Sequence, residues 1–208
     1  MTNREYLNSL SNEEFAKSVL KGTSKSGLDF EKWLEEGHEE LKKVSLKELK
    51  AGTKFNFAGH EFTKLVDEEQ SCYCLLNDTV FESKFGETND WSKSLIRKQL
   101  NEFNKDGNSK AIKGIKKSDL EEVSLNYTAY KIPNGRSTDY ITCLSYEEYW
   151  AYDFPTLDKY SWLRSGGIRN THRAYGLSPS GAVNWGGVDS WLSVRPALHF
   201  KKDLEIEV

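Results

Sequence analysis

The chain has 208 residues, of which 37% are hydrophobic and 12% aromatic, and its formal net charge is -3. This composition excludes a disordered chain, and the length suits one compact domain with an appendage or two small domains. The slightly acidic charge argues against nucleic-acid binding by the whole protein but allows a local basic patch.

The cellular compartment is inferred from three features that the sequence lacks: a disulfide framework, a membrane span and a signal peptide. Its three cysteines are an odd number and do not make a disulfide framework. No apolar run approaches the length of a membrane span, and the amino terminus leads into a polar helix rather than a signal peptide. We therefore expect a soluble, cytoplasmic protein with no membrane partner.

Residues 1–48 carry helical signals. Ser11 and Glu14 have capping-box spacing, in which a hydroxyl and a carboxylate satisfy the free amides of a helix start. Asp29 can cap a second helix that carries Phe30 and Trp33 on one face. We expect an N-terminal helical segment that either packs its apolar stripe on the main domain or docks a partner.

From residue 49 the period changes to that of strands. Residues 52–62 predict a short hairpin that turns near Gly59, and residues 73–76 continue the strand signals. Residues 92–103 then predict a helix with Ser92 as its N-cap, because their apolar residues fall on one helical stripe.

The last third of the chain alternates strand and helix signals. Residues 139–144 predict a strand, and Ser145 with Glu148 has capping-box spacing for a short helix. Two short apolar blocks that each contain an arginine, residues 161–165 and 194–198, then enclose a long loop rich in glycine, serine and asparagine. Strand-like ends around such a loop indicate a rigid scaffold that presents a contact surface.

Sequence blocks over roughly residues 50–200 match a recognisable ordered signature. The matching residues are Trp91, Ile96-Arg97, Leu100-Asn101, Leu144-Ser145, Glu148, Trp162-Leu163-Arg164-Ser165, Gly181 and Val194-Arg195-Pro196-Ala197-Leu198. In this order they resemble a family of bacterial and phage domains of unknown function, distantly similar to the formylglycine-generating enzymes. The resemblance implies an α+β fold, in which residues 49–208 form a C-type-lectin-like domain with a small twisted antiparallel sheet and two helices.

Two arginines stand inside apolar blocks and need internal partners. A buried guanidinium that lacks a carboxylate or carbonyl partner costs several kcal/mol. Glu147, Glu148 and Asp153 are the candidate partners. We assign structural roles to seven residues: Trp91, Arg97, Asn101, Glu148, Trp162, Arg164 and Arg195.

Residues 166–191 are where we expect function to reside. Tyrosine, tryptophan and arginine concentrate binding energy in interfaces, and four arginines against one aspartate between Ser161 and His199 predict a locally basic surface. The alternative is that the tryptophans cap the core and the arginines are merely solvated. The predicted binding residues are Arg169, Asn170, His172, Arg173, Tyr175, Asn184, Trp185, Asp189 and Trp191.

Patterns for chemistry are incomplete. A formylglycine-generating type of enzyme needs a cysteine pair in the C-terminal half, where only Cys143 lies, and the four histidines are scattered. Cys72, Cys74 and His60 could supply three zinc ligands, but no fourth ligand is apparent. We therefore expect no catalytic residues and no cofactor.

These observations together predict a non-catalytic binding protein. The resemblance to bacterial and phage domains implies that it is encoded by a phage or prophage and recognises a host or phage protein, such as a host defence component. Two alternatives stay open. One is a divergent metal-dependent oxidase of the formylglycine-generating type. The other is a nucleic-acid-binding protein that uses the arginines together with the lysine-rich residues 105–117.

Overall fold

The computed structural model describes residues 43–129, 132–167 and 170–207. Residues 43–208 form a compact unit that is separate from residues 1–42. The helical segment expected at the amino terminus therefore lies, up to residue 42, outside the described residues. Lys43–Ser45 is already strand β1 of the main sheet, so this unit begins before residue 49, where the sequence placed the start of the domain.

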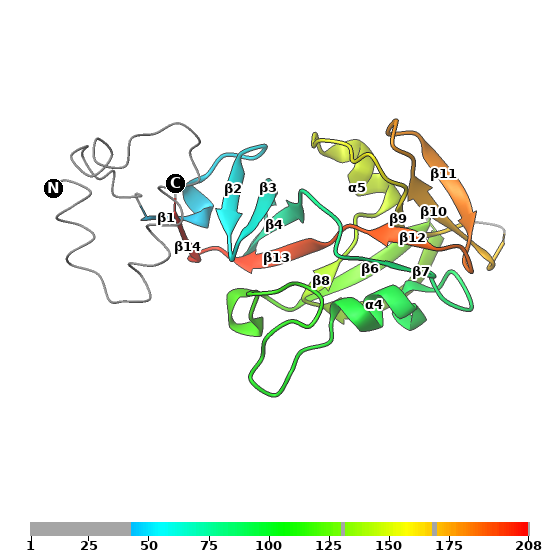
Figure 1. The fold of residues 1–208 in the computed structure, drawn as a ribbon, viewed down its shortest axis with the longest axis horizontal. Coiled ribbons are helices and arrows are strands. Elements are labelled where there is room, and N and C mark those ends of the chain that lie inside the picture. Colours follow the sequence, from blue (N-terminus) through cyan, green and yellow to red (C-terminus); the bar gives the residue numbers. More distant parts are fainter. Residues whose placement is uncertain (1–42, 130–131, 168–169, 208) are drawn as a thin grey trace, which may run out of the picture. The chain divides into compact units, whose positions relative to one another are not determined.

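A seven-stranded sheet contains both ends of this unit (Figure 1). Its neighbouring strands are antiparallel and lie in the order β1 (Lys43–Ser45), β14 (Glu205–Glu207), β2 (Lys54–Phe57), β3 (His60–Asp67), β4 (Ser71–Leu76), β13 (Ala197–Lys201) and β8 (Ile141–Thr142). The β2–β3 hairpin turns through Ala58 and Gly59, which both have positive φ, as tight two-residue hairpin turns require. The turn predicted near Gly59 is confirmed.

A five-stranded sheet forms the other part of the unit, and a separate hairpin lies beside it. The sheet order is β11 (Val183–Gly187), β10 (Arg173–Leu177), β9 (Ser161–Gly166), β12 (Leu192–Val194) and β5 (Phe81–Ser83). Only the β9–β12 pair of this described sheet is parallel. Strands β6 (Val123–Ala129) and β7 (Ile132–Asp139) form the hairpin.

The described residues are mainly β, so the predicted α+β, C-type-lectin-like fold is wrong. The two α-helices of these residues, α4 (Leu95–Leu100) and α5 (Tyr146–Ala151), have only six residues each. The remaining helical segments are single 3-10 turns: η1 (Leu46–Glu48), η2 (Trp91–Lys93) and η3 (Lys117–Asp119). None of the helices in the described ranges is long and apolar enough to cross a membrane.

Polar side chains explain why α4 is shorter than the predicted helix over residues 92–103. Ser94, not Ser92, caps the helix, because its Oγ accepts the Arg97 N–H at 3.1 Å. Asn101 ends the helix, and its side chain binds backbone atoms of Tyr140 and Ile141 instead of a further turn. The apolar stripe is real, but the caps limit the helix to six residues.

The hydrophobic core lies on both faces of the seven-stranded sheet, which explains why β4 is buried along its whole length. Successive side chains of a strand point to opposite faces. Cys72, Cys74 and Leu76 join the larger cluster, which also contains Trp91 and Trp162. On the opposite face lies a second cluster beside α5 and the β10–β11 hairpin, formed by Leu65, Tyr73, Leu75, Leu144, Leu163, Tyr175, Leu177 and Ala197.

Candidate functional site

Aromatic rings follow one another in contact from the β10–β11 hairpin to α5. We call this series the aromatic ladder; in order of contact it is Trp185, Tyr175, Tyr146, Trp150, Tyr149 and Phe154. Successive ring centroids lie between 4.9 and 6.4 Å apart, and all pairs but the tilted second one are edge to face. Edge-to-face contact is favoured by the quadrupoles of the rings, so each ring helps to orient the next.

Two local patterns build the ladder. Tyr175 and Trp185 are direct cross-strand partners, so their side chains leave the hairpin on the same face. Tyr146 and Trp150 are four residues apart on α5, and side chains at that spacing meet on a helix surface.

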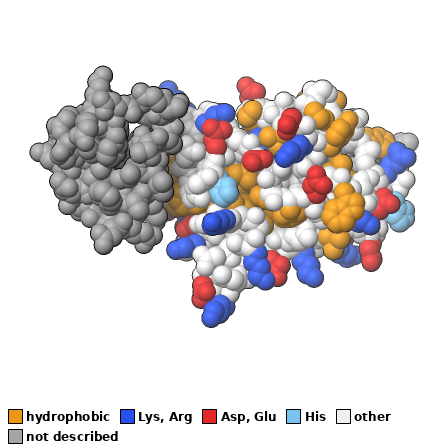
Figure 2. All heavy atoms as spheres, viewed as in Figure 1, with side chains coloured by type: hydrophobic (Ala, Val, Ile, Leu, Met, Phe, Trp, Pro, Cys, Tyr) orange, Lys and Arg blue, Asp and Glu red, His pale blue; other side chains and the backbone are white. Residues whose placement is uncertain are grey.

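The ladder has two exposed members, Trp185 and Trp150, and a buried one, Tyr175, between them. The Tyr175 side chain retains only 4% of its accessible area, whereas Trp185 is 59% exposed and Trp150 is 65% exposed. Figure 2 shows hydrophobic side chains gathered over the part of the domain that carries α5 and the five-stranded sheet. Exposed apolar side chains that are contiguous, rather than scattered singly, mark interaction sites.

A buried ion pair holds α5 against β9. Nη1 of Arg164 donates to Oε2 of Glu148 at 2.5 Å, and Nη2 donates to Oε1. Nη1 also donates to the Cys143 carbonyl at 2.6 Å. The side chain of Arg164 is 5% exposed and that of Glu148 is 22% exposed. Of the three carboxylates considered from the sequence, Glu148 is therefore the one that Arg164 binds.

Glu148 also caps the helix that it anchors. Its Oε2 accepts the Ser145 N–H at 2.9 Å while the Ser145 Oγ accepts the Glu148 N–H at 3.0 Å, which confirms the predicted capping box. The Tyr73 hydroxyl donates to the same carboxylate at 3.0 Å. One carboxylate thus joins the start of α5 to strands β4 and β9.

Electrostatics keeps this pair ionised. Burial on its own raises the pKa of Glu148, but the charge and hydrogen bonds of Arg164 outweigh it, so the pKa lies below its usual value. Burial lowers the pKa of Arg164, and the adjacent Glu148 more than restores it, so the net shift is upward. Burial and the Glu148 charge raise the pKa of Tyr73, so its hydroxyl stays protonated and donates.

Polar contacts continue behind the ion pair to His199. The Tyr73 ring stacks on the His199 ring with centroids 4.4 Å apart, and Nδ1 of His199 lies 2.8 Å from Oε2 of Glu68. Among the described residues, His199 Nε2 has no hydrogen-bond partner. Tyr73 and His199 are each 1% exposed, so we interpret this series as support for the sheet rather than as a reactive site.

Arg195 supports the other end of the ladder. Its Nε donates to the Leu76 carbonyl and its Nη1 to the Pro155 carbonyl, both at 2.7 Å. The guanidinium lies over the Phe154 ring, 5.3 Å from the ring centroid. Burial lowers the pKa of Arg195 to about 10, which leaves the group charged near neutral pH.

The structure brings the predicted binding residues to the surface in part. Tyr175 is buried, and Arg169 lies outside the described residues. Trp191, in the loop before β12, is 64% exposed, but no ring contact among the described residues joins it to the ladder. The other predicted binding residues are exposed: Asn170, His172, Arg173, Asn184, Trp185 and Asp189.

The arginines of the described residues do not form the basic surface that the sequence predicted. Arg164 and Arg195 are both 4% exposed and bind internal acceptors. Arg173 is exposed, but a single described arginine makes no basic patch. The count of arginines in the sequence overstated the surface charge because it included Arg164 and Arg195, which are buried within apolar segments.

A second surface feature is a shallow depression beside the β10–β11 hairpin. Its volume is about 490 Å³, and its lining includes Leu95, His172, Asp189, Glu87 and Lys84. These side chains carry both signs of charge, and Leu95 is the one large hydrophobic side chain among them. The depression lacks the large aromatic area of the ladder and its series of rings in contact.

Asn89 holds the loop that leads into this hairpin. Its Nδ2 contacts the carbonyl oxygens of Gly167, Asn170 and Arg173 at 2.9 to 3.0 Å. A Cβ at Gly166 would come within 2.7 Å of the Asn89 side chain, so only glycine fits there. The start of the hairpin is thereby fixed to the domain.

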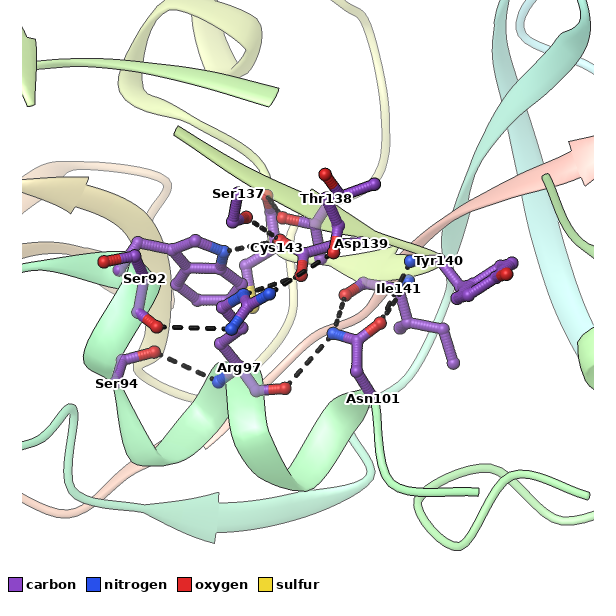
Figure 3. Close-up of polar contacts among 12 residues, drawn as sticks. Ser92, Ser94, Arg97, Asn101, Ser137, Thr138, Asp139, Tyr140, Ile141 and Cys143 are labelled. Carbon is purple, nitrogen blue, oxygen red and sulfur yellow. Dashed lines mark hydrogen bonds and ion pairs between the residues drawn. The ribbon is translucent and has the colours of Figure 1, made fainter. Parts of the chain in front are cut away.

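Trp91 and Arg97 meet on a buried carboxylate outside the ladder, that of Asp139 (Figure 3). Asp139, whose side chain is 0% exposed, accepts from Nε1 of Trp91 at 3.1 Å, from Nε of Arg97 at 2.6 Å and from the Ser137 hydroxyl. The cluster fastens α4 and η2 to the end of β7.

Asn101 and Trp162 have comparable internal partners. Nδ2 of Asn101 donates to the carbonyls of Arg97 and Ile141 at 3.1 and 2.7 Å (Figure 3). Trp162 is 1% exposed, and its Nε1 donates to the Ser83 carbonyl at 2.9 Å. All seven residues to which the sequence assigned structural roles thus bind internal partners.

The thiols are buried and protonated. Burial, with a hydrogen bond to Asp67, raises the pKa of Cys72 to about 11, and burial raises that of Cys143 to about 12. His60 contacts the Lys113 carbonyl at 2.9 Å. Within the described ranges, no group of three or more His, Cys, Asp or Glu residues could hold a metal ion, so Cys72, Cys74 and His60 are not assembled into a site.

Sequence reasoning missed four ladder members and Asn89. Tyr146, Tyr149 and Trp150 follow the predicted cap at helical spacing, so that pattern could have indicated an aromatic face. No local signal marks Asn89, because its three partners lie far along the chain. Compared with known proteins, the chain matches no family model, no curated protein and no solved structure.

Proposed function

We propose that this chain is a non-catalytic binding protein that recognises a partner protein through the aromatic ladder. The observation that carries the proposal is the exposure of two indoles, Trp185 and Trp150, at a ladder whose other members anchor in the domain. Tryptophan and tyrosine supply large contact areas with few rotatable bonds, so ordering them on binding costs little entropy.

Preorganisation supports the same proposal. The Arg164–Glu148 pair and the capping box fix α5, and the register of β10 and β11 fixes Trp185 beside Tyr175. A partner therefore meets rings that already hold their bound geometry, which lowers the free-energy cost of association.

The ordered sequence blocks resemble those of bacterial and phage domains, which favours a protein encoded by a phage or prophage. The proposed partner is therefore a protein of the host cytoplasm. A nucleic acid is the weaker candidate. Two of the four arginines that suggested a basic surface, Arg164 and Arg195, are buried and paired internally. A protein partner needs no such patch, because aromatic anchors supply most of its contact energy.

Capture of partners by matched variants tests the proposal. The full chain, W150A, W185A and the control W191A are immobilised and exposed to bacterial lysate, and bound proteins are identified by mass spectrometry. We expect each ladder variant to lose capture of the same protein at least about tenfold, the effect of an interfacial hot spot. W191A is the control because Trp191 is as exposed as Trp150 but lies outside the ladder.

Melting temperatures close to that of the wild type would show that the variants remain folded. Loss of capture in W191A with retention in both ladder variants would refute the ladder as the contact surface. Retention of the wild-type chain on heparin with steep salt dependence would favour the nucleic-acid alternative.

A further inference from the structure

Among the described residues, strand β11 is an outer strand of the five-stranded sheet, with a neighbouring strand on one side only (Figure 1). Proteins guard such edges with charges, proline or very short strands, because unpaired backbone groups invite another strand. The opposite edge, β5, has three residues and carries Glu82, and the outer strand β1 has three residues and carries Lys43. β11 has five residues, Val183–Gly187, with no charge and no proline.

Two flanking hydrogen bonds determine which backbone groups of β11 point outward. The Ser178 N–H donates to the Ala182 carbonyl at 2.9 Å, and the Val188 N–H donates to the His172 carbonyl at 3.0 Å. In an antiparallel ladder, hydrogen-bonded and non-hydrogen-bonded pairs alternate. Both bonds mark hydrogen-bonded pairs at the two ends of the β10–β11 register, and they agree on which pairs between them are hydrogen-bonded.

In this alternation, Asn184 and Gly186 bond inward to β10. The N–H and carbonyl groups of Val183, Trp185 and Gly187 therefore point away from the sheet. The Gly187 carbonyl accepts the Ser190 N–H at 2.9 Å. For the other outward groups, no strand of the described residues lies beyond β11.

We propose that β11 pairs with β11 of a second copy of this chain, antiparallel and about a twofold axis at Trp185. The outward residues are spaced evenly on both sides of Trp185, so the edge complements itself. Trp185 faces Trp185 and exchanges two hydrogen bonds, and Val183 faces Gly187 on both sides of the axis. The Gly187 carbonyl has two lone pairs, so it accepts the Val183 N–H of the other copy beside its own Ser190 N–H.

Side chains are compatible with this pairing. No residue of β11 is charged, so two copies meet without repulsion between like charges. The two indoles become cross-strand neighbours on one face, an arrangement that stabilises antiparallel pairs. The two five-stranded sheets join into one continuous sheet, and the two aromatic ladders come to lie on the same face. The pairing itself does not depend on what the ladder binds.

Molar mass in solution tests the pairing. Light scattering with size-exclusion chromatography of the full chain, from low micromolar to submillimolar concentration, should show a mass that rises from 23.9 kDa toward twice that value. A mass that stays at 23.9 kDa over the whole range would overturn the proposal. So would a monomer that captures an extended segment of another protein along β11.

Substitution at Val183 provides a matched pair of variants. Val183→Pro removes an outward N–H without removing a bond to β10, and an edge strand tolerates proline at such a position. Val183→Thr keeps both the N–H and the branched shape. We expect the proline variant to remain monomeric and the threonine variant to dimerise like the wild type. W150A should also dimerise, so failure of the proposed ladder function is distinguishable from failure of this pairing.

Cross-linking locates the axis and does not require the proline variant to fold. The native cysteines, Cys72, Cys74 and Cys143, are all buried, so an introduced surface thiol reacts first. Opposed residues of a hydrogen-bonded pair have Cα atoms about 5.5 Å apart, within the range that a disulfide spans. Under mild oxidation, W185C should form a disulfide dimer at least about tenfold faster than the equally accessible W191C. Equal rates would overturn the proposal.

Discussion

Replacing Glu148 by glutamine tests how much the buried ion pair contributes to stability. Glutamine keeps the size of the side chain and an oxygen that can still accept the Ser145 N–H, so the capping box is preserved in part. The negative charge is lost. Arg164, whose side chain is 5% exposed, then retains only neutral acceptors, among them the Cys143 carbonyl.

Removing one partner of a buried pair destabilises a protein by about 3–5 kcal/mol, because the remaining charge is left uncompensated. Glu148 is 22% exposed, so water screens part of the interaction and we expect the lower end, about 3 kcal/mol. For a unit of this size each kcal/mol lowers the melting temperature by about 2–4 °C, which gives a fall of about 6–12 °C.

Thermal unfolding followed by circular dichroism measures this effect. Asp153→Asn is the matched control, since Asp153 is an exposed carboxylate close in sequence, and it should change stability by no more than about 0.5 kcal/mol. Replacing Glu148 and Arg164 together by methionine should restore much of the loss, because neither charge is then buried alone. A melting temperature for E148Q within one or two degrees of the wild type would refute the reasoning, as would a double variant less stable than E148Q.

Three further outcomes follow from particular contacts. The folded pKa of Glu148 is lowered, so its stabilisation is complete above the ordinary value of 4.5 and is lost as the pH falls through the folded pKa. The free energy of unfolding in urea should therefore differ less between E148Q and the wild type below pH 4.5 than at neutral pH. A difference that stays constant with pH would contradict this. Gly186→Ala places a Cβ about 3.0 Å from the buried Trp162 ring and should cost about 1–3 kcal/mol in thermal unfolding, whereas Asn184→Ala on the same strand should cost almost nothing. Asp139→Asn leaves the Arg97 guanidinium without its carboxylate and should destabilise by about 2–3 kcal/mol in chemical denaturation, and an effect below about 0.5 kcal/mol would show that the contact is dispensable.

Local signals were sufficient where both partners of an interaction are close in the sequence. The hairpin at Gly59 and the capping box of Ser145 and Glu148 are of this kind, because a turn or a cap is decided by neighbouring residues. The fold class was not predictable in this way. Strand β13 pairs with β4, although the two strands lie near opposite ends of the domain's sequence. The length of α4 depends on Asn101, which binds backbone that is distant in the sequence.

The site shows the same division. The loop predicted over residues 166–191 is wrong in large part, because the structure forms the β10–β11 hairpin there. Exposure of Trp185 on β11 still agrees with the composition of this segment, since tryptophan among glycines and polar residues has few apolar neighbours to cover it. Burial of Tyr175 could not be read from that composition, because it depends on which face of β10 meets α5. Arg164 was foreseen as buried from its apolar neighbours, but its partner was one of three carboxylates until the fold selected Glu148.

Helix α5 connects stability with binding. It has six residues, too few to be helical on its own, so its place in the domain depends on its cap and on Glu148. E148Q should therefore weaken partner capture even at temperatures where the chain is folded, because Trp150 is no longer held in the ladder. If E148Q and W150A both act through α5, E148Q should add little to the loss of partner capture that W150A already causes. Its effect on capture should instead add to that of W185A, because Trp185 lies on the separate hairpin. Full additivity with W150A would mean that the ion pair stabilises the domain without positioning the contact surface.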